Sequence, residues 1–83
     1  MITVKYFASL RSIAGKDEDQ FNMGSETTLI NLTHEISKTA PLIGEMILGK
    51  KVMVSVNLDV ASLESIIRDV DEIALLPPLS GGI

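Results

Sequence analysis

The residues best suited to chemistry lie at the end of the chain, in the segment from Pro77 to Ile83. Proline fixes φ and has no N–H, so Pro77 and Pro78 end the apolar run before them and favour an extended backbone. Gly81 and Gly82 have no Cβ, so the backbone there can lie close against another protein. From Pro77 to Gly82 an extended segment could reach roughly 20 Å. Such a segment could carry the backbone carboxylate of Gly82 into a narrow channel of a partner's active site.

Composition alone leaves a second interpretation of this segment. The ends of most domains are poorly ordered and contain glycine and serine, so the same residues could be a frayed terminus. Two glycines are a weak signal whose weight depends on the surrounding residues. If the first interpretation is correct, the residues expected to enter the partner's channel ahead of Gly82 are Pro77, Pro78, Leu79, Ser80 and Gly81.

Length and composition exclude several classes of protein. Eighty-three residues make one domain. The absence of cysteine excludes disulfides, thiolate metal sites and a cysteine nucleophile. A formal charge of −4, from eleven acids and seven bases, argues against nucleic acid or an anionic membrane as the main partner. No apolar run has the length of a membrane span, and the first residues alternate like a strand and do not resemble a signal peptide. The cytoplasm is the expected location.

Alternation of apolar and polar residues predicts four strands and a brief edge strand. They are expected at residues 1–7, 20–23, 52–56 and 71–76, with the edge strand at residues 60–61. In the last strand Ile73 and Leu75 are expected to face the core. Residues 16–19 are predicted as a solvated turn, and residues 62–70 as a loop with about one helical turn.

Helical spacing predicts one main helix with a shorter helix on each side. Ser9 is expected to cap the first short helix. Thr27 or Thr28 is expected to cap the main helix, and the third helix is expected to run from Pro41 to Gly49. The main helix has an apolar stripe formed by Leu29, Leu32, Ile36 and Ala40.

This order of elements predicts the fold. Two strands precede the main helix and two or three follow it, which suits a mixed sheet with that helix packed across one face. The expected fold class is therefore α+β, in the β-grasp or ubiquitin-like arrangement. We expect residues 1–76 to form this domain and residues 77–83 to form a flexible C-terminal tail ending in Gly-Gly-Ile.

The remaining polar residues give no sign of a catalytic or metal site. The acids at residues 17–19 and those at residues 69–72 lack the spacing of a calcium loop, so solvated turns are expected. His34, the single histidine, lies off the apolar stripe and is expected to be polar surface. With no visible nucleophile–base pair, we predict that the chain is not a self-contained enzyme and binds no metal.

Three stretches give a specific resemblance. The run Val4-Lys5-Tyr6-Phe7-Ala8-Ser9-Leu10-Arg11, followed by Ala14-Gly15, resembles the start of the MoaD family, the small subunits of molybdopterin synthase within the MoaD/ThiS β-grasp superfamily. Val56-Asn57 agrees with that family, and so does the ending Asp71-Glu72-Ile73-Ala74-Leu75-Leu76-Pro77-Pro78-Leu79-Ser80-Gly81-Gly82. The resemblance covers nearly the whole chain, although the middle third matches only in pattern.

The resemblance implies a sulfur carrier. In that family an E1-like, MoeB-like enzyme uses ATP to adenylate the terminal glycine carboxylate, here that of Gly82, and a sulfur donor converts it to a thiocarboxylate. The carrier then docks on the MoaE-like large subunit, which holds the active site, and donates sulfur to the pterin precursor of the molybdenum cofactor. The carrier itself binds no cofactor, and the ATP is used by the activating enzyme.

The chain departs from the family's pattern at two positions. Ile83 follows Gly82, whereas the family's active form ends at the second glycine, so we expect Ile83 to be removed. Val70 stands where relatives usually have glycine in an Asp-Gly-Asp turn. A β-branched residue resists positive φ, so a different turn geometry is expected there.

The pattern and the resemblance together suggest a docking surface. Phe7, Met53 and Leu76 should lie on the sheet face opposite the core, beside the tail, and Arg11 could pair with an acid on a partner. Scattered surface apolar residues and a solvated arginine are the alternatives. Other functions remain open as well: a ubiquitin-like protein modifier conjugated through Gly82, or sulfur carriage for thiamine or tRNA thiolation.

Overall fold

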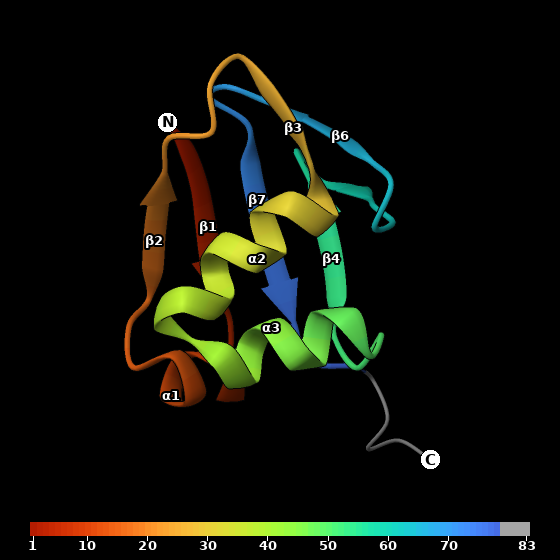
Figure 1. Cartoon of the computed structure of the whole chain (residues 1–83). Coiled ribbons are helices and arrows are strands. Elements are labelled where there is room, and N and C mark those ends of the chain that lie inside the picture. The colour runs from red at the N-terminus through yellow and green to blue at the C-terminus, as the bar shows by residue number, and fades with distance from the viewer. Residues whose placement is uncertain (79–83) are drawn as a thin grey trace.

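Five strands form one mixed sheet in the computed structural model, which describes residues 1–78 of the chain (Figure 1). The order across the sheet is β2-β1-β7-β4-β5. Only the β1–β7 pair is parallel, and the other neighbouring strands run antiparallel. The strands are β1 (Ile2–Tyr6), β2 (Glu18–Phe21), β4 (Met53–Val56), β5 (Asp59–Val60) and β7 (Glu72–Leu76). The last strand therefore lies at the centre of the sheet, and the predicted β-grasp arrangement is confirmed.

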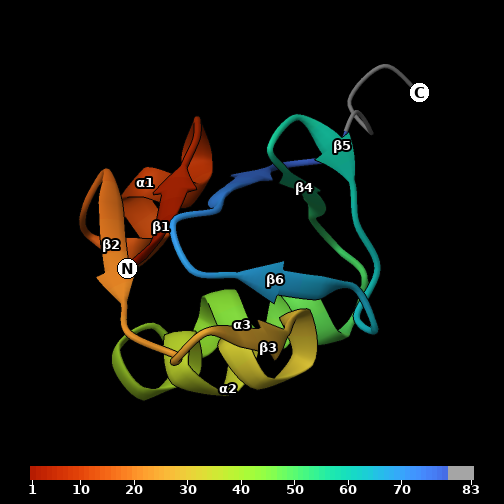
Figure 2. The ribbon, with the colours of Figure 1, turned by 90° about the horizontal axis from the view of Figure 1, so that it is seen from above.

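Two helices cover one face of this sheet, and the opposite face carries no helix among residues 1–78 (Figure 2). They are α2 (Leu29–Thr39) and α3 (Pro41–Leu48), while the short α1 (Ser9–Ala14) follows β1. Thr28 caps α2 as predicted, because its hydroxyl oxygen accepts the N–H of Asn31 at 3.2 Å. The predicted cap at Ser9 is wrong. Ser9 is already the first helical residue, and no side chain caps α1.

The core lies between the helices and the covered face of the sheet. Alternation along each strand sends every second side chain inward, and the apolar stripes of the helices meet them. Fully burying a Leu or Ile side chain stabilises the fold by roughly 1.5–3 kcal/mol. The fully buried apolar side chains of the strands and the two covering helices are Ile2, Val4, Tyr6, Leu29, Leu32, Ile36, Ile43, Ile67, Ile73 and Leu75.

Helices α2 and α3 pack closely at Gly44. An added Cβ on Gly44 would fall 1.7 Å from the hydroxyl oxygen of Ser37 and 3.3 Å from its Cα. The hydroxyls of Thr33 and Ser37 donate back to the carbonyls of Leu29 and Thr33, at 2.8 and 2.9 Å. The polar side chains at this contact are therefore satisfied within α2, and a glycine on α3 lets the two helices approach.

A second, two-stranded sheet corrects the prediction for residues 62–70. β3 (Glu26–Thr28) pairs antiparallel with β6 (Ile66–Arg68), where a loop with a helical turn was expected. Ile67 is fully buried opposite Thr27. The conformation of β6 is fixed by a partner far away in the sequence, which local periodicity does not show.

The predicted turn at residues 16–19 is also partly wrong, because β2 begins at Glu18. Glu18 lies opposite Lys5 in the register, where opposite charges face each other. The carboxylate of Asp19 accepts the hydroxyl of Tyr6 at 3.1 Å and pairs with Lys16 at 2.8 Å. Cross-strand partners therefore allow a run of acids to form a strand.

Asn57 fixes the start of β7. Asn57 and Leu58 form the two-residue turn between β4 and β5, with φ of 49° and 75°. The side chain of Asn57 donates to the carboxylate of Asp71 at 2.9 Å and accepts the N–H of Glu72 at 3.0 Å. The same Asp71 carboxylate accepts the N–H of Arg68 at 2.8 Å. This network joins the β4–β5 turn to the turn that leads into β7.

Val70, in that second turn, has a φ of 66°, so the expectation that a valine would change the turn geometry is wrong. The left-handed conformation costs an L-residue roughly 1–2 kcal/mol, and χ1 of a β-branched side chain is restricted as well. Val70 is 80% exposed, so little packing offsets this cost. The hydrogen bonds of Asp71 around it hold the turn in place.

We therefore predict that Val70→Gly raises the free energy of unfolding by about 1 kcal/mol, because glycine adopts positive φ without strain. For a domain of this size the melting temperature should rise by roughly 4–8 °C. The matched control is Val60→Gly, since Val60 is 83% exposed but lies in a strand. That control should lose roughly 0.5–1 kcal/mol. Urea unfolding that shows no gain for Val70→Gly would contradict this interpretation of the turn.

Candidate functional site

The chain leaves the sheet at the end of β7. Because β1 and β7 are parallel and β4 is antiparallel to β7, the ends of β1 and β7 meet the start of β4 at one end of the sheet (Figure 1). Leu75 is buried, Leu76 is exposed, and Pro77 and Pro78 follow as half-buried and exposed residues. The prolines cannot donate to a further ladder bond. The predicted tail-insertion residues Leu79, Ser80 and Gly81, with Gly82 and Ile83, lie outside the described residues.

Beside this exit, Phe7, Leu76 and Met53 form a row across three strands on the uncovered face of the sheet; we call it the apolar row. Met53 lies directly opposite Leu76 in the register. The N–H of Phe7 donates to the carbonyl of Leu75 at 3.1 Å, so the β1–β7 pairing continues to Phe7. The exposed fractions of Phe7, Met53 and Leu76 are 41%, 45% and 37%. The predicted neighbours thus lie together at the surface, and their docking role stays a prediction.

Val60 extends this apolar surface and was missed from the sequence. It lies opposite Ser55 in the register, and because Ser55 is two residues from Met53 in β4, Val60 is on the same face as the apolar row. The signal was present in the brief edge strand predicted at residues 60–61, whose outward side chain was not assigned.

Away from the tail exit the uncovered face becomes polar. Lys5 pairs with Glu72 at 2.9 Å across β1 and β7. The hydrogen bond that the Lys5 ammonium donates to the carboxylate of Glu72, with the attraction of that charge, raises the pKa of Lys5, so the ammonium stays charged. The face therefore has an apolar end beside the exit of the chain and a charged, paired region farther along the strands.

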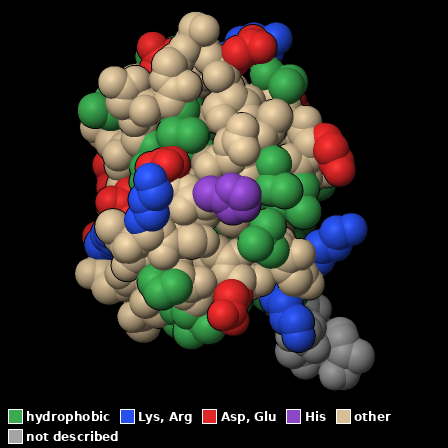
Figure 3. Space-filling model, viewed as in Figure 1, with side chains coloured by type: hydrophobic (Ala, Val, Ile, Leu, Met, Phe, Trp, Pro, Cys, Tyr) green, Lys and Arg blue, Asp and Glu red, His purple; other side chains and the backbone are tan. Residues whose placement is uncertain are grey.

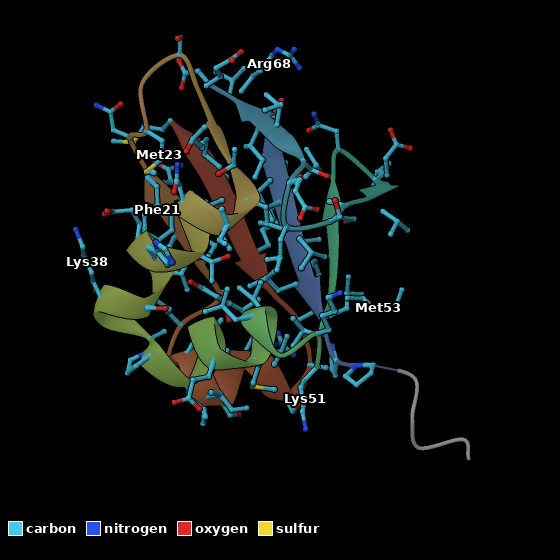
Figure 4. The ribbon with its side chains drawn as sticks, turned by 45° about the vertical axis from the view of Figure 1, so that its right-hand side comes forward. Phe21, Met23, Lys38, Lys51, Met53 and Arg68 are labelled. Atoms are coloured by element: carbon cyan, nitrogen blue, oxygen red, sulfur yellow. The ribbon has the colours of Figure 1, made fainter. Side chains whose placement is uncertain are left out.

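Arg11 is exposed on α1, shortly after Phe7. Its carbonyl accepts the N–H groups of Gly15 and Lys16, at 2.8 and 3.2 Å. Within residues 1–78 its guanidinium forms no ion pair, and the same holds for Lys50 and Lys51. Lys51 lies near Met53 at the end of the sheet where β7 finishes (Figure 4).

The other groups that could do chemistry are held in structural or surface positions. The Tyr6 hydroxyl donates to Asp19, and burial, followed by the charge of Asp19, raises its pKa, so it stays protonated. The single histidine, purple in Figure 3, is exposed on the face of the molecule that the helices cover. Residues 1–78 contain no group of three His, Asp or Glu side chains placed to hold a metal ion. In the same range no helix is long and apolar enough to cross a membrane.

The chain is similar to known proteins over its whole length. The model of the ThiS family matches residues 4–82. The molybdopterin synthase sulfur carrier subunit of Chlamydomonas reinhardtii is 31% identical over 83 residues, covering 98% of each chain. The subunit of the same name from Haemophilus influenzae is 34% identical over 87 residues, covering 99% of this chain and 100% of the relative. Among solved structures, SAMP1 (small archaeal modifier protein 1) from Haloferax volcanii matches with a TM-score of 0.83 and 25% identity, covering 98% of each chain.

Because the apolar row lies at the surface, we predict that truncating it costs little stability. Phe7→Ala should lower the free energy of unfolding by less than about 1 kcal/mol, whereas Leu75→Ala, at a fully buried site, should cost about 2–5 kcal/mol. Urea unfolding of both variants measures the difference. Equal losses would mean that Phe7 is part of the core and is not free to bind a partner.

Proposed function

The chain belongs to the ThiS family, and from that membership we propose that it is the sulfur carrier subunit of a molybdopterin synthase. The observation that supports this most strongly is identity of 31% and 34% to two sulfur carrier subunits, along essentially the whole of each chain. The described geometry agrees with that role, because the central strand β7 brings the chain to one end of the sheet, beside an exposed apolar row. We propose the cytoplasm as the compartment.

The proposed chemistry takes place on the carbonyl carbon of Gly82. A carboxylate is a poor acyl donor, so a MoeB-like enzyme would join it to AMP. The carboxylate oxygen attacks the α-phosphate of ATP and pyrophosphate leaves. A donor of sulfide then attacks the acyl carbon, AMP leaves as the acyl–oxygen bond breaks, and a thiocarboxylate remains. The activating enzyme supplies the groups that stabilise the developing charge, and this chain supplies a reachable end. Because the chain has no cysteine, the sulfur would be carried on the backbone.

This chemistry requires a free carboxylate on Gly82. In the printed sequence the carbonyl of Gly82 forms an amide with Ile83. An amide oxygen cannot be adenylated as a carboxylate, so we propose that a protease removes Ile83 before activation.

The apolar row would dock the carrier on its partners. Phe7, Met53 and Leu76 are exposed together at the base of the tail, where a MoaE-like large subunit or the activating enzyme must contact the body of the carrier. Arg11, which has no ion pair within residues 1–78, would meet an acid on that partner. The three side chains would form the centre of the interface, and Arg11 its rim.

Conjugation to other proteins is the second candidate function. It is favoured by the similarity to a solved structure named as a small archaeal modifier protein. The same activated Gly82 would then be attacked by a lysine amine and form an isopeptide bond. Sulfur carriage for thiamine or tRNA thiolation would use the same thiocarboxylate with a different acceptor.

We predict that protein purified from its native cell ends at Gly82. Intact mass spectrometry should show loss of Ile83, and a fraction heavier by the difference between sulfur and oxygen. A mass shift from a lysine-linked protein would support the modifier instead. Native protein that always retains Ile83 would contradict the sulfur-carrier proposal.

We also predict that Leu76→Glu weakens binding to the large subunit by roughly 10-fold or more, because a charge would be buried at the centre of the interface. The matched control is Lys38→Glu, which changes an exposed residue of α2 on the opposite side of the sheet. Calorimetry with the purified large subunit measures both affinities. Unchanged binding by Leu76→Glu would show that the apolar row is not the docking surface.

A further inference from the structure

A cavity of about 390 Å³ lies beside β4, and its lining includes Val52 and Met53, at the end of the sheet where β7 finishes. Its inner wall is apolar and comes from three elements, with Leu29 of α2, Ile47 of α3 and Val54 of β4. Ala61 and Leu63 form the opposite wall, and Lys50 lies at one side. Its volume is in the range of sites that bind small ligands or inserted side chains.

The cavity exists because the segment after β5 forms hydrogen bonds first with β4 and then with the start of α2. β5 has two residues and pairs with Ser55 and Val56, and the N–H of Ala61 donates to the carbonyl of Val54 at 2.9 Å. The chain then turns away to satisfy the first N–H groups of α2. The carbonyls of Leu63 and Ser65 accept the N–H groups of Ile30 and Leu29, each at 3.0 Å. Val52, which precedes β4, is thus left without a neighbouring segment on the β5 side.

This leaves the backbone of Val52, in the bend just before β4, free beside the cavity. The next residue but one, Val54, accepts the N–H of Ala61 through its carbonyl, whereas within residues 1–78 no backbone hydrogen bond joins Val52 to a neighbour. An extended segment of another chain could pair with the free N–H and C=O of Val52 and continue the line of β5.

The direction of such a strand follows from β5. β5 runs antiparallel to β4, so a strand that continued it would run toward the start of β4. A residue placed opposite Val52 would direct its side chain to the same face as Val52, which lines the cavity. That position therefore suits a bulky apolar side chain.

Charge distinguishes the two ends of the site. Lys50 and Lys51 lie at the start of β4, and neither forms an ion pair within residues 1–78. The N–H groups of Lys50 and Lys51 donate to the last carbonyls of α3, at 3.1 and 2.8 Å, and so fix both backbones. Glu64 is the one acid of the lining, and its carboxylate accepts the hydroxyl of Ser62 at 3.5 Å. The end of a bound strand near the lysines should therefore be acidic.

We propose that this cavity is a second binding site, which takes an extended segment of a partner protein with a bulky apolar residue followed by acidic residues. The segment pairs with the free backbone groups of Val52, places its apolar side chain between the helices and β4, and brings its acids to Lys50 and Lys51. Met53 and Val60 belong both to the cavity lining and to the uncovered sheet face, so one partner could contact both surfaces. This second binding site does not depend on whether the chain carries sulfur.

The test is a titration of the isotope-labelled chain with the peptide acetyl-Ser-Phe-Val-Asp-Glu-amide, followed by backbone amide NMR shifts. Saturable shifts are expected at Val52, Val54, Ala61 and Leu63. A peptide that ends in Lys-Lys in place of Asp-Glu should bind about threefold more weakly, the scale of exposed ion pairs. With a peptide that has serine and threonine in place of phenylalanine and valine, the amide shifts should not reach saturation.

Matched variants locate the site. Val60→Trp should cover the mouth of the cavity and weaken the peptide by about tenfold, on the scale of losing one buried apolar anchor. Leu58→Trp should leave binding unchanged, because Leu58 is 91% exposed and does not line the cavity. Lys50→Glu should weaken the peptide about threefold, while Lys38→Glu should not change it. Amide spectra of the free variants check that each remains folded.

Three results would overturn the proposal. The first is an absence of saturable shifts at these residues. The second is shifts that centre on Phe7 and Leu76 instead, or that persist unchanged in Val60→Trp. The third is a shift at the same residues on raising the protein concentration alone, which would assign the cavity to a second copy of the chain. None of these results depends on Gly82, so they leave the sulfur-carrier proposal to its own test.

Discussion

The position of β7 between β1 and β4 is the constraint on which the rest of the structure depends. The last strand is hydrogen-bonded on both sides, and its inward residues Ile73 and Leu75 are fully buried. The chain is therefore anchored in the centre of the sheet as far as Leu76. Pro77 and Pro78 then cannot extend the ladder. The apolar row takes one residue from each of the three strands that meet there, so the same pairing that anchors the chain also assembles the proposed docking surface.

The opposite end of β7 is held by polar contacts and strained backbone. Asn57 joins the β4–β5 turn to Asp71 and Glu72, and three non-glycine residues in these turns, Asn57, Leu58 and Val70, have positive φ. Such conformations persist only where the surrounding structure fixes them. Here the register of the three central strands β1, β7 and β4 fixes the positions of the strand ends, and the turns at these ends must adopt these backbone conformations. Strain at exposed turns is thus offset by burial in the sheet, and it lies at the end of the sheet away from the tail exit.

The sequence predicted the features that depend on local pattern. Strands β1, β4 and β7, the cap at Thr28 and the α+β arrangement follow from periodicity and from side chains that act within a few residues.

The features that depend on distant partners were not predictable in this way. β6 is a strand because it pairs with β3, and Glu18 and Asp19 enter β2 because Lys5, Tyr6 and Lys16 stabilise them. Val70 has positive φ because the network around Asp71 fixes the turn.

The cavity arises where residues 62–65 turn away from β4 to reach α2. It depends on segments that are far apart in the sequence, so no single stretch of sequence predicts it. The placement of Gly82 lies outside the described residues, so its role rests on the family.

We propose that the body of the protein holds and presents its C-terminal segment, and that another enzyme activates the carboxylate of Gly82. ATP–pyrophosphate exchange measures this activation. The purified activating enzyme is mixed with labelled pyrophosphate, ATP, and either the chain ending at Gly82 or the chain retaining Ile83. We expect exchange that depends on the chain ending at Gly82 and is absent with Ile83 present. Equal exchange with both chains, or none with the chain ending at Gly82, would contradict it.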